Sequence, residues 1–167
     1  TGGAVPNLEY KFTPTRCCCE EQSPKQSSND NLSIGTEILR EQGGYRTAAF
    51  GKWHIGKSPE ALGYQVNDGG NGNGVGNSKK PKDPKLIFSL SRKSIEFMET
   101  QTRAGKPFFL QVSHYANHLK YQGLRETIGK YETEHADEAT EYHKDPLWAA
   151  MNENLDTGIG MILDKLE

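Results

Sequence analysis

Lys52 and His54 stand on either side of one tryptophan, directly after Gly51 and a short apolar stretch. A lysine offers a full positive charge and three N–H donors, and a histidine offers ring nitrogens whose protonation changes near neutral pH. A second pair, His114 and His118, follows another apolar stretch further along the chain. These residue types suit the binding of a tetrahedral anion and the protonation of a leaving oxygen. We therefore predict an anion site containing Lys52, His54 and His118, with His114 as a further candidate for substrate binding.

Each of these polar groups follows a stretch with the pattern of a buried strand. The first stretch is residues 45–50 and the second is residues 108–112, and both are short and mainly apolar. In α/β proteins the catalytic and binding residues lie in loops past the carboxyl ends of parallel strands. A glycine such as Gly51 lets the backbone turn tightly there. If the two strands are parallel, their carboxyl ends lie at one edge of a sheet. The two polar groups are then expected to meet there.

Helical patterns precede both strands. A first helix is predicted from Ser33, which can cap its start, to Gly43 and Gly44, which can end it. A second helix is predicted after Pro84 and can be terminated by Gly105. Its apolar residues recur at helical spacing: Ile87, Leu90, Ile95, Phe97 and Met98.

A third helix is predicted at the end of the chain, where Asp145 and Pro146 suit its first turn. Its apolar residues form one helical stripe, which is typical of a helix that packs on a core: Leu147, Met151, Leu155, Ile159, Ile162, Leu163 and Leu166. The order of helix, strand, long loop, helix, strand and helix predicts an α/β fold, with a mainly parallel sheet flanked by helices.

The long loop, residues 56–84, contains glycines packed among asparagines. A phosphate-cradling loop needs a set glycine spacing between a strand and a helix, and neither the G-x-G-x-x-G nor the G-K-[ST] pattern occurs here. This favours a flexible surface loop or a loop at the rim of a substrate site over a nucleotide site.

The remaining sequence offers few candidates for chemistry. Residues 1–30 have no sustained period and are expected to be irregular. The tandem Cys17, Cys18 and Cys19 cannot staple distant parts of a fold to one another. Three neighbouring thiols could bind a soft metal, but without a second cysteine group an incidental loop cluster, or one bridge to a missing segment, is favoured. His135 and His143 lie in a charged stretch and are expected to be solvated. No metal ligand is assigned in this chain.

The composition sets further limits. A chain of 167 residues can bury one core of ordinary domain size, and its net charge of -2 with scattered basic residues argues against a nucleic-acid partner. Only 34% of the residues are hydrophobic and the mean hydropathy is -0.78, which indicates a core left unfinished. No apolar run approaches the roughly 20 residues that a membrane span needs.

Residues 44–54 resemble, almost letter for letter, the second signature of the formylglycine-dependent sulfatases, a family of the alkaline-phosphatase-like superfamily. In that signature a lysine and a histidine contact the sulfate and the modified nucleophile, which implies these roles for Lys52 and His54. Residues 107–118 are similar to a later strand and loop whose last histidine binds the sulfate, which implies this role for His118. The family often has a proline two places further on, where this chain has Lys120. Residues 151–160 resemble the helix that follows, so the resemblance covers residues 31–167.

The resemblance also implies groups that this sequence does not supply. The family nucleophile is a cysteine or serine in a C-x-P-x-R motif, oxidised to formylglycine. Residues 12–16 imitate that motif with Phe12 in place of the nucleophile, and a phenyl ring can be neither oxidised to the aldehyde nor made nucleophilic. Thr1 and Gly2 fit the end of the real motif. We therefore expect an internal fragment of a sulfatase catalytic domain, with the nucleophile upstream, the calcium ligands outside the chain, and no activity of the fragment alone.

The function that this resemblance implies is hydrolysis of sulfate esters of a small molecule or carbohydrate, and by analogy a periplasmic or secreted protein. Two alternatives remain open. One is a phosphate or phosphonate ester hydrolase of the same superfamily, since charge on the tetrahedral group is the main difference. The other is a non-catalytic binding relative in which Phe12 truly replaces the nucleophile.

Overall fold

The computed structural model describes residues 35–134 and 145–166. They belong to a compact unit that spans residues 33–167. The expectations for residues 1–30, the three cysteines, the Ser33 cap, and His135 and His143 lie outside the described residues.

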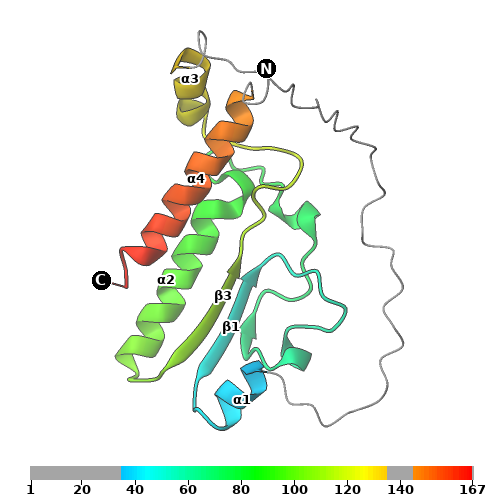
Figure 1. Cartoon of the computed structure of the whole chain (residues 1–167), viewed down its shortest axis with the longest axis vertical. Helices are drawn as coiled ribbons and strands as arrows, with labels where there is room; N and C mark the ends of the chain where they lie inside the picture. Colours follow the sequence, from blue (N-terminus) through cyan, green and yellow to red (C-terminus); the bar gives the residue numbers. More distant parts are fainter. Residues whose placement is uncertain (1–34, 135–144, 167) are drawn as a thin grey trace, which may run out of the picture. The chain divides into compact units, whose positions relative to one another are not determined.

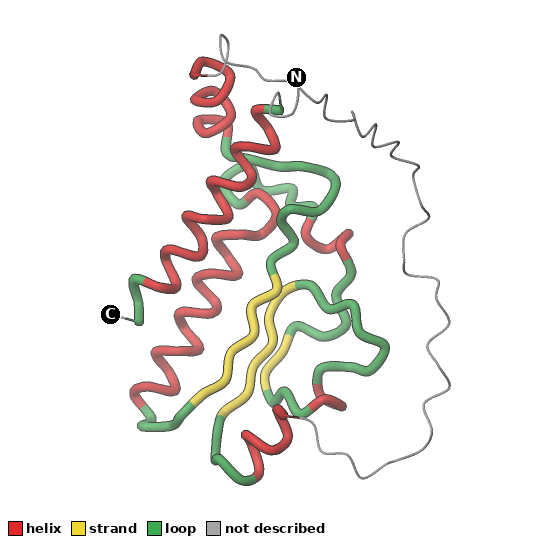
Figure 2. The backbone as a smooth tube through the Cα atoms, viewed as in Figure 1, coloured by secondary structure: helices red, strands yellow, loops and turns green. Residues whose placement is uncertain are grey.

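The described residues contain a three-stranded parallel sheet in the order β2-β1-β3 (Figure 2). The strands are β1 (Arg46–Gly51), β2 (Val66–Asn67) and β3 (Phe108–Ser113). β1 is the central strand, and all of its residues after the first are buried, as expected for a strand covered on both faces. β1 and β3 pair along their full length, from Arg46 opposite Phe108 to Gly51 opposite Ser113. The predicted α/β fold with a parallel sheet is therefore confirmed.

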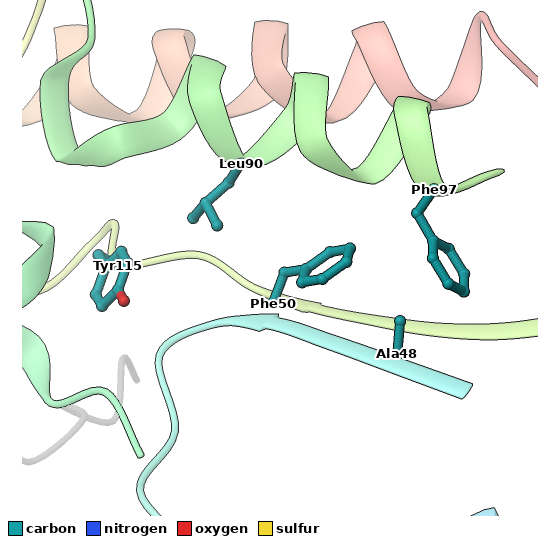
Figure 3. Packing of buried hydrophobic residues seen from close by; sticks show 5 residues of the cluster. All are labelled: Ala48, Phe50, Leu90, Phe97 and Tyr115. Carbon is teal, nitrogen blue, oxygen red and sulfur yellow. The ribbon is translucent and has the colours of Figure 1, made fainter. Parts of the chain in front are cut away.

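Four α-helices accompany the sheet in the described residues (Figure 1). They are α1 (Gly35–Glu41), α2 (Ile87–Arg103), α3 (Arg125–Glu134) and α4 (Pro146–Leu163). Short 3-10 turns are η2 (Glu60–Leu62), η3 (Asn73–Gly76) and η4 (Pro84–Leu86). α2 lies along the sheet, and α4 packs on α2 from the side away from the strands (Figures 1 and 3). No helix among the described residues is both long and apolar enough to cross a membrane.

One face of the sheet packs on α2. Phe50 of β1 meets Phe97 of α2 edge to face, with ring centroids 5.9 Å apart. Figure 3 shows Leu90 and Phe97 pointing from α2 towards Phe50 and Ala48, with Tyr115 completing the cluster. These contacts fix the strand that precedes Lys52.

The other face is covered by residues from the segments that follow β1. Trp53 and Tyr64 pack edge to face at 5.6 Å between ring centroids and enclose Ala49, with Leu62 against them. The Tyr64 ring also lies over Phe109, at 6.3 Å between centroids. Loop residues therefore cover much of this face, and helix α1 contacts β1 beside them.

Two elements were not predicted. β2 has only two residues, too few to display the alternation of a strand, and it forms because Val66 and Asn67 pair with Ala48 and Ala49. It lies inside the segment 56–84, which we had interpreted as entirely irregular. Helix α3 has a polar sequence without an apolar stripe. Buried Asn154 of α4 holds the start of α3 in place by hydrogen bonds. The Asn154 side chain accepts from the Leu124 N–H at 2.8 Å and donates to the Thr127 hydroxyl at 3.0 Å.

The helix expected from Asp145 to the end of the chain is observed as α4, Pro146–Leu163, and its start is confirmed. Asp145 caps it, accepting from the N–H groups of Leu147 at 2.9 Å and Trp148 at 3.2 Å, with Pro146 in the first turn.

The predicted apolar stripe of α4 is confirmed only in part: Met151 is buried, and Leu147, Leu155 and Ile162 are partly buried. The buried residues of α4 are Ala150, Met151, Asn154 and Gly158, while Ile159, Leu163 and Leu166 of the predicted stripe are exposed. The reason is the close approach of α2: a Cβ atom at Gly158 would lie 2.5 Å from Ile87 Cγ2 and 3.0 Å from Ser91 Oγ. At this distance only small or shape-matched side chains fit between the helices.

Candidate functional site

Two loops at the carboxyl edge of the sheet carry the predicted site residues. The β1 loop is residues 52–54 and the β3 loop is residues 114–118. The Lys52 N–H donates to the Ser113 carbonyl at 2.8 Å, so the loops begin side by side. Gly51 permits this approach because its φ is +95° and a Cβ atom there would lie 2.2 Å from the Ser113 oxygen. The expected meeting of the two polar groups at one edge is thus observed for their backbones.

Within the β1 loop the three side chains have different surroundings. Trp53 is buried, and its indole N–H donates to the Lys57 carbonyl at 2.8 Å while its backbone N–H donates to the Asn71 carbonyl at 2.7 Å. Lys52 is partly exposed and His54 is exposed. Trp53 therefore packs and fixes the loop, and solvent reaches the lysine and histidine on either side of it.

His118 is exposed and both of its ring nitrogens have neighbours. Nε2 lies 2.8 Å from the side-chain nitrogen of Asn73, and Nδ1 lies 3.4 Å from the Leu119 carbonyl oxygen. Its backbone N–H donates to the Tyr115 carbonyl at 3.1 Å. The Asn73 Oδ1 atom is buried and has no hydrogen-bond partner in the part of the chain that the structure describes. Turning the amide over would therefore offer Nε2 an acceptor in place of a donor. The Asn73 amide can thus meet either protonation state of the imidazole.

The glycine-rich segment, residues 68–76, contacts both loops. Its Asn71 carbonyl accepts from Trp53 of the β1 loop, and its Asn73 meets His118 of the β3 loop. Gly76 lies so close to Tyr115 that a Cβ atom there would be 2.2 Å from the tyrosine side chain. Of the two interpretations left open for this segment, its position favours a substrate rim over an unconnected surface loop.

Asp68, at the start of the glycine-rich segment, joins it to the sheet and to α2. One carboxylate oxygen accepts from the Gly51 N–H at 2.8 Å, and the other pairs with the Lys93 ammonium. Burial raises the pKa of the Tyr115 phenol, the Asp68 charge adds to that rise, and a hydrogen bond with Asn71 opposes it. The segment is therefore held at several points around the turn that presents Lys52.

His114 differs from His118. Both of its ring nitrogens are buried and have no hydrogen-bond partner among the described residues, and burial lowers the pKa of its imidazole. In this arrangement a ligand does not reach the ring nitrogens, so the predicted contact of His114 with substrate would require the loop to rearrange.

Lys85, which follows Pro84 in η4, was not among the residues predicted from the sequence. Its side chain is fully buried, and its ammonium donates to Asn77 Oδ1 at 3.1 Å and to the Leu119 carbonyl at 3.0 Å. Burial lowers its pKa. No sequence signal separates it from Lys79, Lys80 and Lys82, which precede it and are exposed.

Comparison with protein-family models identifies the family of this chain. The model described as Sulfatase matches residues 3–167, nearly the whole sequence. The chain belongs to the sulfatase family. A search of curated protein sequences found no match.

Solved structures with the same fold include a protein described as Ps i-CgsB, both alone and in complex with k-i-k-neocarrahexaose. The complex has a TM-score of 0.59 and 21% sequence identity to this sulfatase chain, and the uncomplexed form has a TM-score of 0.57 and 22% identity. In both cases the match covers 78% of this chain and 35% of the other. The sulfatase chain thus spans about a third of the length of these structures, and at this identity the likeness concerns the fold.

The calcium ion implied by the resemblance needs a cluster of oxygen ligands. Across residues 35–134 and 145–166, no group of three or more His, Cys, Asp or Glu side chains could hold a metal ion. The carboxylate and imidazole groups of the described residues therefore do not fit a calcium ion.

Proposed function

We propose that this chain supplies the sulfate-binding part of a sulfatase that hydrolyses sulfate esters. The observation that carries the proposal is the hydrogen bond from the Lys52 N–H to the Ser113 carbonyl, which brings the β1 and β3 loops to one edge of the sheet. The ammonium of Lys52 and the imidazoles of His54 and His118 belong to these two loops. Together they offer the positive charge and the N–H donors that a sulfate group requires.

Each residue has a distinct task in this proposal. Lys52 neutralises charge on the transferring sulfate, since a point charge helps most where negative charge builds up in the transition state. His118 donates from Nε2 to a sulfate oxygen, and the Asn73 amide, which lies beside Nε2, turns its N–H donors to the same sulfate. His54 is exposed and is the group we assign to donating a proton to the leaving alcohol oxygen.

The resemblance implies that formylglycine would supply the nucleophile and that calcium would supply further charge stabilisation. No described residue fits either group, so both belong to the proposal for the intact protein.

For the substrate we propose a sulfated carbohydrate or a sulfated small molecule. One neighbouring structure is described as a complex with k-i-k-neocarrahexaose, which supports a carbohydrate. Localisation in the periplasm or outside the cell stays a prediction.

The test uses the intact protein that contains this chain, with Lys52→Met and His118→Ala as variants. Lys57→Met is the control, because Lys57 is an exposed lysine in the same segment between β1 and β2. Sulfate release from an aryl sulfate and from sulfated oligosaccharides would be measured by ion chromatography. We expect both site variants to lose about 100-fold or more in kcat/KM, in the range seen on removing one oxyanion donor, and the control to keep wild-type activity.

Three results would contradict the proposal: wild-type activity in both site variants, faster hydrolysis of the matching phosphate ester, or no hydrolysis of either ester by the intact protein. The second would favour the phosphatase alternative and the third the non-catalytic one. The 167-residue chain alone should be inactive, and sulfate release by it above a Lys52→Ala control would overturn that expectation.

A further inference from the structure

Lys85 is buried in a way that needs an explanation. It is 0% exposed, and no carboxylate among the described residues pairs with its ammonium. An unpaired ammonium loses several kcal/mol of hydration when buried, and neutral oxygens replace that only in part. Its backbone is also in the left-handed region, with φ 52° and ψ 21°, which costs a non-glycine residue about 1–3 kcal/mol. An apolar side chain of similar length would avoid the loss of hydration.

The contacts of Lys85 lead to the β3 loop. Its ammonium donates to the carbonyl of Leu119, the residue directly after His118, at 3.0 Å. The same carbonyl oxygen lies 3.4 Å from His118 Nδ1. The ammonium and the imidazole therefore share one acceptor.

A second residue holds the same two segments together. The Lys85 N–H donates to Gln122 Oε1 at 2.8 Å, and the Gln122 side chain also donates to the Ser78 carbonyl at 2.9 Å. Two contacts thus join the segment before α2 to the residues that follow the β3 loop. One is made by Gln122, and the other, next to His118, is made by the Lys85 ammonium. Of Lys85 and Gln122, it is Lys85 that contacts the Leu119 carbonyl beside the imidazole.

We propose that Lys85 is a positioning residue for His118: by binding the Leu119 carbonyl it fixes the peptide and ring orientation with which His118 meets the sulfate. This inference rests on the proposed function, since it gives Lys85 a role through a residue of the proposed sulfate site. Lys85 does not itself touch the substrate.

The experiment is a double-mutant cycle in the intact protein, read out as the affinity for inorganic sulfate by titration calorimetry. The variants are Lys85→Met, His118→Ala and the two combined. Lys82→Met is the control, because Lys82 is an exposed lysine three residues before Lys85. Thermal unfolding of each variant shows whether it is folded. The binding measurement needs no turnover, so it does not depend on the substrate being known.

We expect Lys85→Met to weaken sulfate binding about tenfold, and the combined variant to bind no more weakly than His118→Ala alone, because residues that act through one another are not additive. A purely structural role would lower the affinity in the His118→Ala background as well. The control should bind like the wild type.

If the two losses multiply, or if folded Lys85→Met binds sulfate like the wild type, the inference is wrong. If His118→Ala leaves sulfate affinity unchanged, the proposed role of His118 fails first and the inference fails with it.

Should Lys85→Met not fold, Asn77→Asp replaces it: a carboxylate at position 77 pairs with the Lys85 ammonium and draws it away from the Leu119 carbonyl. That variant should show the same coupling to His118→Ala, and wild-type affinity in Asn77→Asp would overturn the inference.

Discussion

The side-chain amide of Asn73 lies 2.8 Å from Nε2 of His118, although 45 residues separate them in the sequence. This contact joins the glycine-rich segment to the β3 loop and makes Asn73 part of the surroundings of a proposed sulfate ligand. It also places the glycine-rich segment beside the proposed sulfate site, which its composition alone does not predict.

The first prediction concerns a negative charge at this contact. Asn73→Asp should lower kcat/KM for a sulfate ester by more than tenfold, because a carboxylate beside His118 repels the anionic substrate. Asn73→Ala should cost less, about 2–12-fold, the equivalent of one ordinary hydrogen bond. Val75→Asp is the matched control, since Val75 lies in the same 3-10 turn and is 51% exposed. Equal effects of the two aspartates would refute a specific role for Asn73.

The second prediction concerns the close approach at Gly51. Gly51→Ala should destabilise the protein by about 2 kcal/mol or more, because it combines a left-handed backbone with a Cβ atom 2.2 Å from the Ser113 oxygen. Gly56→Ala in the next turn has nothing within 4 Å of its added Cβ and should change stability little. Urea unfolding measures both. Similar midpoints for the two variants would contradict the structure at this turn.

The third prediction concerns pH and His114. Burial lowers the pKa of its imidazole from the usual histidine value of about 6.5, so below about pH 6.5 the unfolded chain takes up a proton that the folded chain does not. Its contribution to stability is therefore fully present above that pH and is lost as the pH falls, by at most about 1.4 kcal/mol per pH unit. Urea unfolding between about pH 7.5 and pH 5.5 should show a steeper loss in the wild type than in His114→Gln. Identical slopes would count against the buried neutral ring.

The fourth prediction concerns the contact between α2 and α4. Gly158→Ala should destabilise the protein by about 1–3 kcal/mol, because the added methyl group would lie 2.5 Å from Ile87 Cγ2. Gly160→Ala lies in the same helix with nothing within 4 Å, and it should stabilise by about 0.5–1 kcal/mol through helix propensity alone. Thermal unfolding should give shifts of opposite sign, and shifts of the same sign would argue against this packing.

The elements that lead into the site could be predicted from the sequence because local patterns specify them. The strand expected at residues 45–50 is observed as Arg46–Gly51, and the cap expected at Asp145 makes the hydrogen bonds of an N-cap. Gly51 was expected to turn the backbone tightly, and its φ of +95° agrees. These features depend on neighbouring residues, so a single sequence is enough to find them.

The features that were missed depend on partners far along the chain. Lys85 bonds to a carbonyl 34 residues away, and nothing near it in sequence indicates that it is buried. The stripe on α4 was confirmed only in part for a related reason. Apolar spacing shows that a helix has an apolar side. The α2 surface, however, selects Gly158 by shape, and Leu124 and Thr127 select Asn154 by hydrogen bonding, which spacing does not encode.

The link between Lys52 and Ser113, and that between Trp53 and Asn71, run from main chain to main chain. Neither depends on which side chain is present, apart from the need for glycine at the turn. Substitutions of Lys52 or Ser113, whose side chains are partly exposed, would therefore leave the framework intact while changing what it presents to a ligand. Such an arrangement allows specificity to diverge during evolution with little risk to folding.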